Sequence, residues 1–294
     1  MSEKYEGIIP PVITSFDKDG GVYEKGCRNI VEFLLPYVSG YYICGSYGSG
    51  PLMEVPERKR VVEVMAEQVN GRALVIPHVG APSTKATIDL AKHAEKTGAD
   101  AIGIVPPYYY SYPEKNLINH YKAVLDAVTI PVFAYDNPKL SNNTITPQML
   151  AQLAEMGMAG IKDSSFSIIS FAEKMNAVVK PGFSFIIGTE AQFLPAFLMG
   201  ARACVSGLAN AFPKLMHDLF LALKDGQYEK ARILHLKVVK TRSILHHAPT
   251  ITSIHAVLDH LGIDAGFPRM PYLTIEDDKR KEMIRELKQI GELV

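Results

Sequence analysis

The sequence of 294 residues predicts an α/β fold, a (β/α)8 TIM barrel followed by a C-terminal helical extension. Short apolar segments alternate with amphipathic segments eight times between residues 7 and 225. Such regular alternation is typical of a parallel sheet covered by helices. A doubly wound open sheet is the alternative, but it rarely needs eight regular repeats. The length also suits a barrel, because about 250 residues commonly form one such domain.

Each repeat consists of an apolar strand and a helix with one apolar face. The expected strands cover residues 7–14, 40–44, 73–79, 101–105, 130–135, 158–162, 183–188 and 203–206. The expected helices cover residues 23–35, 56–69, 84–97, 114–127, 147–156, 166–178 and 191–199, with an eighth that ends near residue 225. Pro56 suits the first turn of its helix, where no backbone N–H is needed. We therefore assign residues 1–225 to the barrel and residues 226–294, which lack strand signals and predict about three helices, to a C-terminal helical appendage.

The composition excludes several classes of protein. The chain is 47% hydrophobic and 21% charged, and its 31 Lys and Arg residues balance 31 Asp and Glu residues, so no nucleic-acid or anionic-membrane partner is indicated. Cys27, Cys44 and Cys204 lie far apart in apolar surroundings, which fits reduced thiols in a cytoplasmic protein. The N-terminus has no signal-peptide pattern, and no apolar run reaches the ~20 residues that span a bilayer. We expect a cytoplasmic protein without a membrane segment.

Lys162 is the first candidate for chemistry, because it follows the apolar segment Met158–Ile161 and precedes polar turn residues. Active sites of barrels lie at the carboxyl ends of the strands, where this amine is expected. An amine at the rim of a buried core loses hydration, which lowers its pKa. A neutral lysine amine can attack a ketone and form a Schiff base. The alternative is a structural lysine whose ammonium extends from the strand end to water.

Two further features converge on the same rim. Tyr135 ends the strand before that of Lys162, where its hydroxyl could transfer protons; a core tyrosine bonded to backbone is the alternative. The turn Gly45-Ser46-Tyr47-Gly48 lacks the dinucleotide and P-loop patterns, so we expect its backbone N–H groups and the Ser46 hydroxyl to hold a carboxylate. A tight strand-to-helix turn is the alternative there.

The remaining strand ends contribute weaker candidates. The last strands end near Gly188, Glu190, Val205 and Ser206, and the fourth ends in the run Tyr108-Tyr109-Tyr110. Such aromatic runs more often pack or form subunit contacts, so at most one of these tyrosines is expected to be catalytic. His78 follows the third strand, but no second histidine and carboxylate lie at ligand spacing, so no metal site is predicted.

These residues, in this order, resemble the dihydrodipicolinate synthase / N-acetylneuraminate lyase family of pyruvate-dependent class I aldolases. The resemblance runs from residue 7 to about residue 261. It implies that Lys162 binds pyruvate covalently and that Tyr135, with Pro138 three residues later, is the general acid/base. It also implies that Gly45-Ser46-Tyr47-Gly48 holds the pyruvate carboxylate and that Tyr109 reaches a neighbouring subunit's site. Residues 206–210 resemble the motif that closes the eighth strand.

The departures from the family pattern bear on the substrate. Leu140 stands where dihydrodipicolinate synthases carry an arginine, and Ala191 follows Glu190 where sialate lyases carry an Asp-Glu pair. Ser49 replaces a usual glutamate, and Tyr47 replaces a second hydroxyl residue, so the carboxylate would depend more on backbone N–H groups. The loop is similar to that of some 2-keto-3-deoxy-sugar-acid aldolases.

The resemblance implies a carbon–carbon lyase that cleaves or forms a 2-keto acid, with pyruvate as one product and an aldehyde as the other. A 2-keto-3-deoxy sugar acid is the expected substrate, and Glu190 or Ser206 would contact the hydroxyls of the aldehyde. Ser46 and a partner's Tyr109 would assist Tyr135, and Gly188 and Val205 would line the substrate site. No metal or dissociable cofactor is expected beyond the imine on Lys162, and the family suggests a homotetramer. The alternatives are a dihydrodipicolinate (4-hydroxy-tetrahydrodipicolinate) synthase, an N-acetylneuraminate lyase, a nucleotide-dependent enzyme, and a barrel that only binds 2-keto acids.

Overall fold

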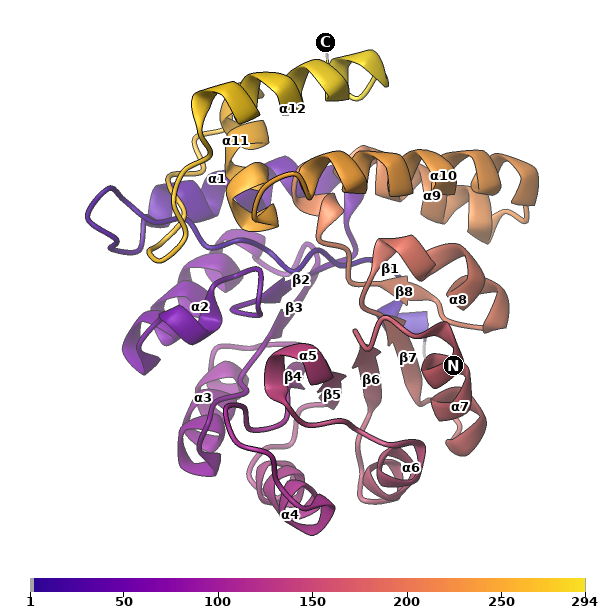
Figure 1. Cartoon of the computed structure of the whole chain (residues 1–294). Coiled ribbons are helices and arrows are strands. Elements are labelled where there is room, and N and C mark those ends of the chain that lie inside the picture. Colours follow the sequence, from indigo (N-terminus) through magenta and orange to yellow (C-terminus); the bar gives the residue numbers. More distant parts are fainter. Residues whose placement is uncertain (1–2, 294) are drawn as a thin grey trace.

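A computed structural model describes residues 3–293 and contains eight parallel strands surrounded by helices (Figure 1). Residues 1, 2 and 294 lie outside the described residues. Residues 1 and 2 belong to the predicted barrel range and to the N-terminal segment without a signal-peptide pattern, and residue 294 is the last of the predicted appendage. The strands are β1 (Gly7–Ile8), β2 (Gly40–Ile43), β3 (Leu74–Pro77), β4 (Ile102–Ile104), β5 (Val132–Asp136), β6 (Gly160–Asp163), β7 (Ser184–Ile187) and β8 (Ala203–Cys204).

The strands close into a barrel. Six of them pair in the order β1-β8-β7-β6-β5-β4, and β2 pairs with β3. Two parallel bridges join these groups, one between Pro11 and Tyr42 and the other between His78 and Gly103. Every neighbouring strand pair is parallel, as the sequence predicts, and the (β/α)8 barrel is confirmed.

The first strand is much shorter than the predicted segment 7–14. Pro10 and Pro11 carry no backbone N–H and cannot donate to a neighbouring strand, so regular pairing stops at Ile8. The chain nevertheless continues along the barrel, because Tyr42 N donates to Pro10 O at 3.0 Å and Val12 N donates to Tyr42 O at 3.0 Å. The prediction was wrong about the length of the strand and right about its path.

Eight helices surround the strands, close to the predicted ranges. They are α1 (Glu24–Leu34), α2 (Val55–Val69), α3 (Thr84–Lys96), α4 (Glu114–Leu125), α6 (Pro147–Glu155), α7 (Ile168–Ala177), α8 (Phe193–Met199) and α9 (Pro213–Lys224). Ser83, Thr146 and Ser167 begin α3, α6 and α7, where each side-chain oxygen accepts a backbone N–H of the first turn. A short helix, α5 (Pro138–Ser141), was not predicted; it begins at Pro138 directly after β5.

Short 3-10 helices occupy several connections: η1 (Glu3–Tyr5), η2 (Leu35–Tyr37), η3 (Gly50–Leu52), η4 (Glu190–Gln192) and η5 (Leu208–Asn210). Two of them, η4 and η5, follow the last two strands, β7 and β8, within a few residues. In η5, Asn210 is buried and its side chain accepts the N–H of Ile13 at 3.0 Å and donates to Pro11 O at 3.1 Å. This asparagine therefore ties the end of the eighth repeat to the beginning of the first.

Three helices follow the barrel: α10 (Tyr228–Leu245), α11 (Thr250–His260) and α12 (Asp277–Gln289). Figure 1 shows them together on one side of the barrel, away from α4 and α6. The segment between α11 and α12 returns to the barrel, where Phe267 and Phe16 exchange two backbone hydrogen bonds of 2.8 and 3.2 Å. Arg269 also pairs with Glu57 at the start of α2. The division of the chain at residue 225 remains a prediction.

The core has two layers. An inner cluster fills the barrel and includes Tyr42, Val105, Tyr135, Ile186 and Val205. A larger outer cluster lies between the strands and the helices. The two layers arise because successive side chains of a strand point to opposite faces. No helix within residues 3–293 combines the length and the apolar character needed to cross a membrane.

Candidate active site

Lys162 and Tyr135 lie side by side inside the barrel. They are partners in the register of β5 and β6. Lys162 Nζ lies 3.7 Å from the centre of the Tyr135 ring and 4.2 Å from the centre of the Tyr42 ring. Only 4% of Lys162 and 3% of Tyr135 is exposed. The two residues that the sequence places at the ends of adjacent strands therefore share one buried site.

Burial changes the protonation of Lys162. Loss of hydration lowers the pKa of its amine below the ordinary 10.5, and the opposing effect of Tyr135, with a smaller one from Cys204, does not cancel it. A larger fraction of the amine is therefore neutral near neutral pH than for an exposed lysine. A neutral amine has the lone pair that a nucleophile needs.

The pKa of the Tyr135 hydroxyl is lowered, whereas burial raises the pKa of most tyrosines. Burial raises the pKa of its hydroxyl, but the charge of Lys162 and hydrogen bonds from Ser46, Asn137 and Ser164 lower it further, so that the net pKa is below 10.0. Asn137 Nδ2 donates to the hydroxyl at 2.8 Å, and Ser46 Oγ lies 3.4 Å from it. A hydroxyl with these neighbours can both accept and release a proton.

The glycine-rich turn at residues 45–50 contains backbone N–H groups that meet no acceptor among the described residues. Ser49 N and Gly50 N bond back to Ser46 O and Gly45 O, whereas the N–H groups of Ser46 and Tyr47 meet no acceptor among residues 3–293. The turn requires its glycines, because a Cβ at Gly48 would lie 2.8 Å from Val12 O and one at Gly50 would lie 2.0 Å from Cys44 O. With Ser46 beside Tyr135, these free donors lie at the same rim as the lysine. The arrangement can hold a small anion.

A polar cluster forms another wall of the rim. Ser206 Oγ donates to Glu190 Oε2 at 3.0 Å, and Arg242 Nε lies 3.0 Å from Glu190 Oε1. Glu190 and Ser206 are buried, whereas Arg242 is partly exposed. The Tyr47 ring lies against Gly207, where an added Cβ would be only 2.5 Å from a ring carbon. Predicted site residues from three strand ends thus meet one arginine that the sequence did not indicate.

Gly188 and Val205 occupy structural positions at the same rim. A Cβ at Gly188 would lie 2.0 Å from Ser164 Oγ, so glycine lets the ends of β6 and β7 approach closely. Ser164 Oγ donates to Gly188 O at 3.3 Å. Val205 is buried in the inner cluster beside Tyr135. Direct contact of either residue with a substrate stays a prediction.

Tyr109 does not join the site within one chain. It is 80% exposed, its ring packs edge-to-face on Tyr110 at 4.9 Å, and its φ of 87° is a conformation that bulky residues rarely adopt. Such exposure is compatible with a residue that reaches another subunit. Its predicted role in a partner's site stays a prediction.

Two inner aromatic residues beside the candidate pair, Tyr42 and His78, carried little sequence signal. The ring centres of Tyr42, His78 and Tyr135 lie 5.8–6.0 Å from one another. Burial, reinforced by the charges of Arg58 and Lys162, holds the pKa of His78 well below 6.5, so this histidine is neutral. Its Nε2 accepts the N–H of Val105 at 3.3 Å. Within residues 3–293, no three histidine, cysteine or acidic side chains cluster as metal ligands would.

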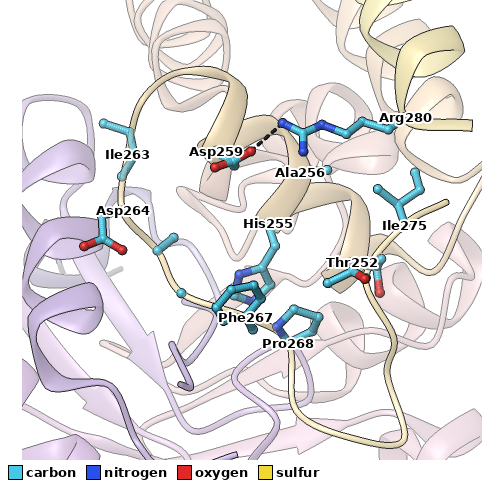
Figure 2. Close-up of a pocket in the computed structure, with 13 residues that line it drawn as sticks. Thr252, His255, Ala256, Asp259, Ile263, Asp264, Phe267, Pro268, Ile275 and Arg280 are labelled. Atoms are coloured by element: carbon cyan, nitrogen blue, oxygen red, sulfur yellow. Dashed lines mark hydrogen bonds and ion pairs between the residues drawn. The ribbon is translucent and has the colours of Figure 1, made fainter. Parts of the chain in front are cut away.

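A separate cavity of about 220 Å³ lies in the C-terminal extension, between α11, α12 and the segment that joins them (Figure 2). His255 and Phe267 line it, and an ion pair between Asp259 and Arg280 lies beside it. Burial lowers the pKa of His255 to about 4, so its ring is neutral. This cavity shares no residue with the rim around Lys162, and we do not include it in the candidate active site.

Comparison with known proteins agrees with this geometry. Residues 4–290 match the model of the dihydrodipicolinate synthetase family. An uncharacterised DapA-like lyase of Halobacterium salinarum is 34% identical, covering 97% of this chain and 94% of its own. The probable 2-dehydro-3-deoxy-D-pentonate aldolase YjhH of Escherichia coli K12 is 30% identical, covering 97% of each chain. The crystal structure of YagE from E. coli K12 in complex with pyruvate is 27% identical, with a TM-score of 0.93 over 97% of this chain and 98% of that one.

A closed (β/α)8 barrel with these matches along its whole length is a carbon–carbon lyase of the pyruvate-dependent class I aldolase type. The chain belongs to the dihydrodipicolinate synthetase family.

Proposed function

We propose that this protein cleaves or forms a 2-keto-3-deoxy sugar acid through a Schiff base between the keto acid and Lys162. The observation that carries the proposal is the buried Lys162 amine, held 3.7 Å from the centre of the Tyr135 ring and with a lowered pKa. The protonated imine withdraws the electrons that C–C cleavage releases, so no metal or dissociable cofactor is required.

Cleavage begins when the neutral Lys162 amine attacks C2 of the keto acid. The C2 oxygen receives one proton from the attacking nitrogen and a second from the Tyr135 hydroxyl, then leaves as water, which gives the protonated imine and leaves Tyr135 deprotonated. Tyr135 then accepts the proton of the C4 hydroxyl, the C3–C4 bond breaks, and its electron pair moves to the imine. The aldehyde departs and an enamine remains. Tyr135 passes the proton it has accepted to C3 of the enamine, and water then adds at C2 and returns one proton to Tyr135 as pyruvate and the free amine are released.

The free N–H groups of Ser46 and Tyr47 would bind the carboxylate of the keto acid. Two donors on one tight turn fix the orientation of a planar carboxylate, which places C2 toward the lysine. The hydroxyl of Ser46, 3.4 Å from that of Tyr135, would extend the proton path. Because backbone N–H groups bind the carboxylate, no charged side chain is needed for this step.

The polar cluster of Glu190, Ser206 and Arg242 would receive the aldehyde end. Glu190 can accept hydrogen bonds from sugar hydroxyls, and Arg242 and Ser206 can donate them. Leu140, which is exposed, stands where a synthase would need an arginine, and this difference supports a sugar-acid substrate over aspartate semialdehyde. The similarity to the pentonate aldolase YjhH supports the same choice.

The pH dependence of imine formation follows from the pKa of Lys162. Only the neutral amine attacks pyruvate, so the rate rises with pH through that pKa; because the pKa is lowered, we expect the midpoint of this rise below pH 10.5. Deprotonation of Tyr135, whose pKa is below 10.0, should lower the rate again at higher pH. Since Tyr135 raises the pKa of Lys162, Tyr135→Phe should move the midpoint to still lower pH. Borohydride quenching of imine at a series of pH values measures both. A midpoint at or above 10.5 would contradict the assignment.

Removing the Arg242 guanidinium should weaken binding of the aldehyde portion of the substrate and leave imine formation with pyruvate nearly unchanged. Arg242→Gln should raise the KM for the sugar-acid substrate about tenfold, as expected when one or two charge-assisted hydrogen bonds are lost. Imine formation with pyruvate should change less than twofold. Arg232→Gln is the matched control, because Arg232 is an exposed residue of the same helix, paired with Glu229. Equal effects of the two substitutions would rule out a substrate role for Arg242.

The proposal extends to assembly and location. The exposed Tyr109, Phe166 and Ile169 offer apolar contact surface on the barrel, which supports a homo-oligomer, with a tetramer as our specific proposal. All three cysteines are buried and free, which supports a reducing compartment such as the cytoplasm. A monomeric mass by light scattering would contradict the assembly.

A substrate panel tests the function itself. Purified protein is incubated with 2-keto-3-deoxy pentonates and hexonates, N-acetylneuraminate, and pyruvate with aspartate semialdehyde, and the products are separated by chromatography. We expect pyruvate release from at least one sugar acid at a kcat/KM well above the rates with the other two. Preferential condensation of aspartate semialdehyde would instead identify a synthase, and trapping of pyruvate without turnover of any substrate would identify a binding protein.

A further inference from the structure

A buried lysine lies behind the proposed catalytic pair. Lys174, in α7, has no exposed surface, and its ammonium lies between two carboxylates. Its Nζ is 2.6 Å from Asp163 Oδ2 and also forms an ion pair with Asp136 Oδ2. All three side chains are at most 1% exposed. We call Asp136, Lys174 and Asp163 the buried triad.

The register of β5 and β6 connects the triad to the site. Asp136 directly follows Tyr135, Asp163 directly follows Lys162, and the two aspartates are partners just as the tyrosine and lysine are. Adjacent side chains of a strand point to opposite faces. The lysine and tyrosine therefore face into the barrel, while the two aspartates face outward, where α7 supplies Lys174. The Lys174 ammonium thus links the two strands through the residues that directly follow the two catalytic positions.

The other oxygen of each aspartate holds the loop after its strand. Asp136 Oδ1 accepts the N–H of Ile145 at 3.0 Å, and Asp163 Oδ1 accepts the N–H of Ser165 at 2.8 Å. The first of these loops begins with Asn137, which donates to the Tyr135 hydroxyl at 2.8 Å. The triad therefore fixes two strand ends and also the loop that supplies a hydrogen bond to Tyr135.

Stability alone does not account for such a group. Burying three charges carries a large desolvation cost, and apolar residues of similar size often give equal or greater stability. Burial raises the pKa of Asp136 despite its ion pair with Lys174, whereas the two carboxylates outweigh burial at Lys174 and raise the pKa of its ammonium above the ordinary 10.5. What charges supply and apolar contacts do not is a directional link that fixes one arrangement of two strands.

We propose that Lys174 is a positioning residue that, through Asp136 and Asp163, fixes the placement of Lys162 relative to Tyr135. The inference rests on the proposed function, because it assumes that these two residues form the imine together. It assigns Lys174 no contact with the substrate. The triad acts through geometry, since a misplacement of about 1 Å between reacting groups can lower a rate about 10²-fold.

The test separates placement from binding. Rates of borohydride-trapped imine formation are measured against pyruvate concentration, which gives a saturating rate and a half-saturating concentration. In Lys174→Met the saturating rate should fall about 10²-fold. The half-saturating concentration should stay within twofold, because the turn at Ser46 and Tyr47 is untouched. The control for lost stability is Val124→Ala, which opens a cavity at a fully buried residue near the end of α4, away from the carboxyl ends of the strands.

A second variant, Asp163→Asn, tests the inference even if Lys174→Met does not fold. Asp163→Asn leaves Lys174 paired with Asp136 and removes only one link, so the fold should survive with a smaller fall in the saturating rate. Folding of each variant is checked by circular dichroism and thermal melting. A saturating rate equal to that of Val124→Ala for folded Lys174→Met would overturn the inference, as would an unchanged rate for Asp163→Asn if Lys174→Met does not fold. Absence of trapping in the unmodified protein would instead refute the proposed function, and this inference with it.

Discussion

Lys162→Met should lower turnover about 10⁴-fold or more, because it removes the nucleophile on which every later step depends. Methionine fills a similar volume between the rings of Tyr42 and Tyr135 without an amine, so we expect the fold to persist. Removing a desolvated amine from the barrel also removes a cost of burial. Steady-state release of pyruvate from the sugar acid found in the panel measures the effect.

The control for this substitution is Lys139→Met. Lys139 is an exposed lysine in α5, close to the same rim, and it has no part in the proposed chemistry. It should retain turnover within about twofold, as surface substitutions usually do. If Lys162→Met keeps more than a hundredth of the activity while Lys139→Met loses most of it, the nucleophile has been wrongly assigned.

The second large effect is expected for Tyr135→Phe, which should lower kcat by about 10²–10⁴-fold. The ring, and thus the packing against Lys162, remains. The hydroxyl that would protonate the C2 oxygen and accept the C4 proton is lost, together with its hydrogen bond from Asn137. The KM should change less than kcat, because the proton transfers occur on the reaction path and not in binding.

Tyr42→Phe offers a matched control for the loss of a phenol. Tyr42 lies on another side of the same amine, with its ring centre 4.2 Å from Lys162 Nζ, and its buried hydroxyl has no hydrogen-bond partner among the described residues. We expect kcat within about threefold of the unmodified protein and no loss of melting temperature, because no hydrogen bond is lost. Equal losses for the two phenylalanine variants would indicate that ring packing, and not the Tyr135 hydroxyl, matters.

The barrel could be predicted because its signal is local. Each strand is a short apolar run and each helix has its own apolar face. Strand and helix then alternate regularly along the chain. The positions of Tyr135 and Lys162 followed from the same logic, since residues that end adjacent parallel strands meet at one rim. The length of the first strand was less predictable, because Pro10 and Pro11 stop regular pairing while the chain keeps its course.

Arg242 could not be predicted because its partner is distant in the sequence. It lies in a long helix that the sequence assigns to an appendage, and only the packing of α10 over η4 brings it to Glu190. Lys174 poses the same problem, because a lysine within an ordinary helix gives no sign that it is buried between two strand-end aspartates. Long-range packing, and not local pattern, determines both contacts.

Tyr47 departs from the family pattern, and its side chain and its backbone have different neighbours. As a substitution for a second hydroxyl residue, it predicts a carboxylate site that depends more on backbone N–H groups. In the structure its ring turns away to pack on Gly207, while its backbone N–H remains free beside that of Ser46. The side chain thus belongs to the wall near Glu190, and the backbone of the turn keeps its two donors.

The most direct test of the account is reductive trapping of the imine on Lys162. The protein is incubated with pyruvate, reduced with borohydride, digested and examined by peptide mass spectrometry. We predict one modified site, Lys162, carrying a single pyruvate-derived group, and no modification when either pyruvate or borohydride is left out. An unmodified Lys162 under saturating pyruvate, or modification of another lysine in its place, would contradict the central claim.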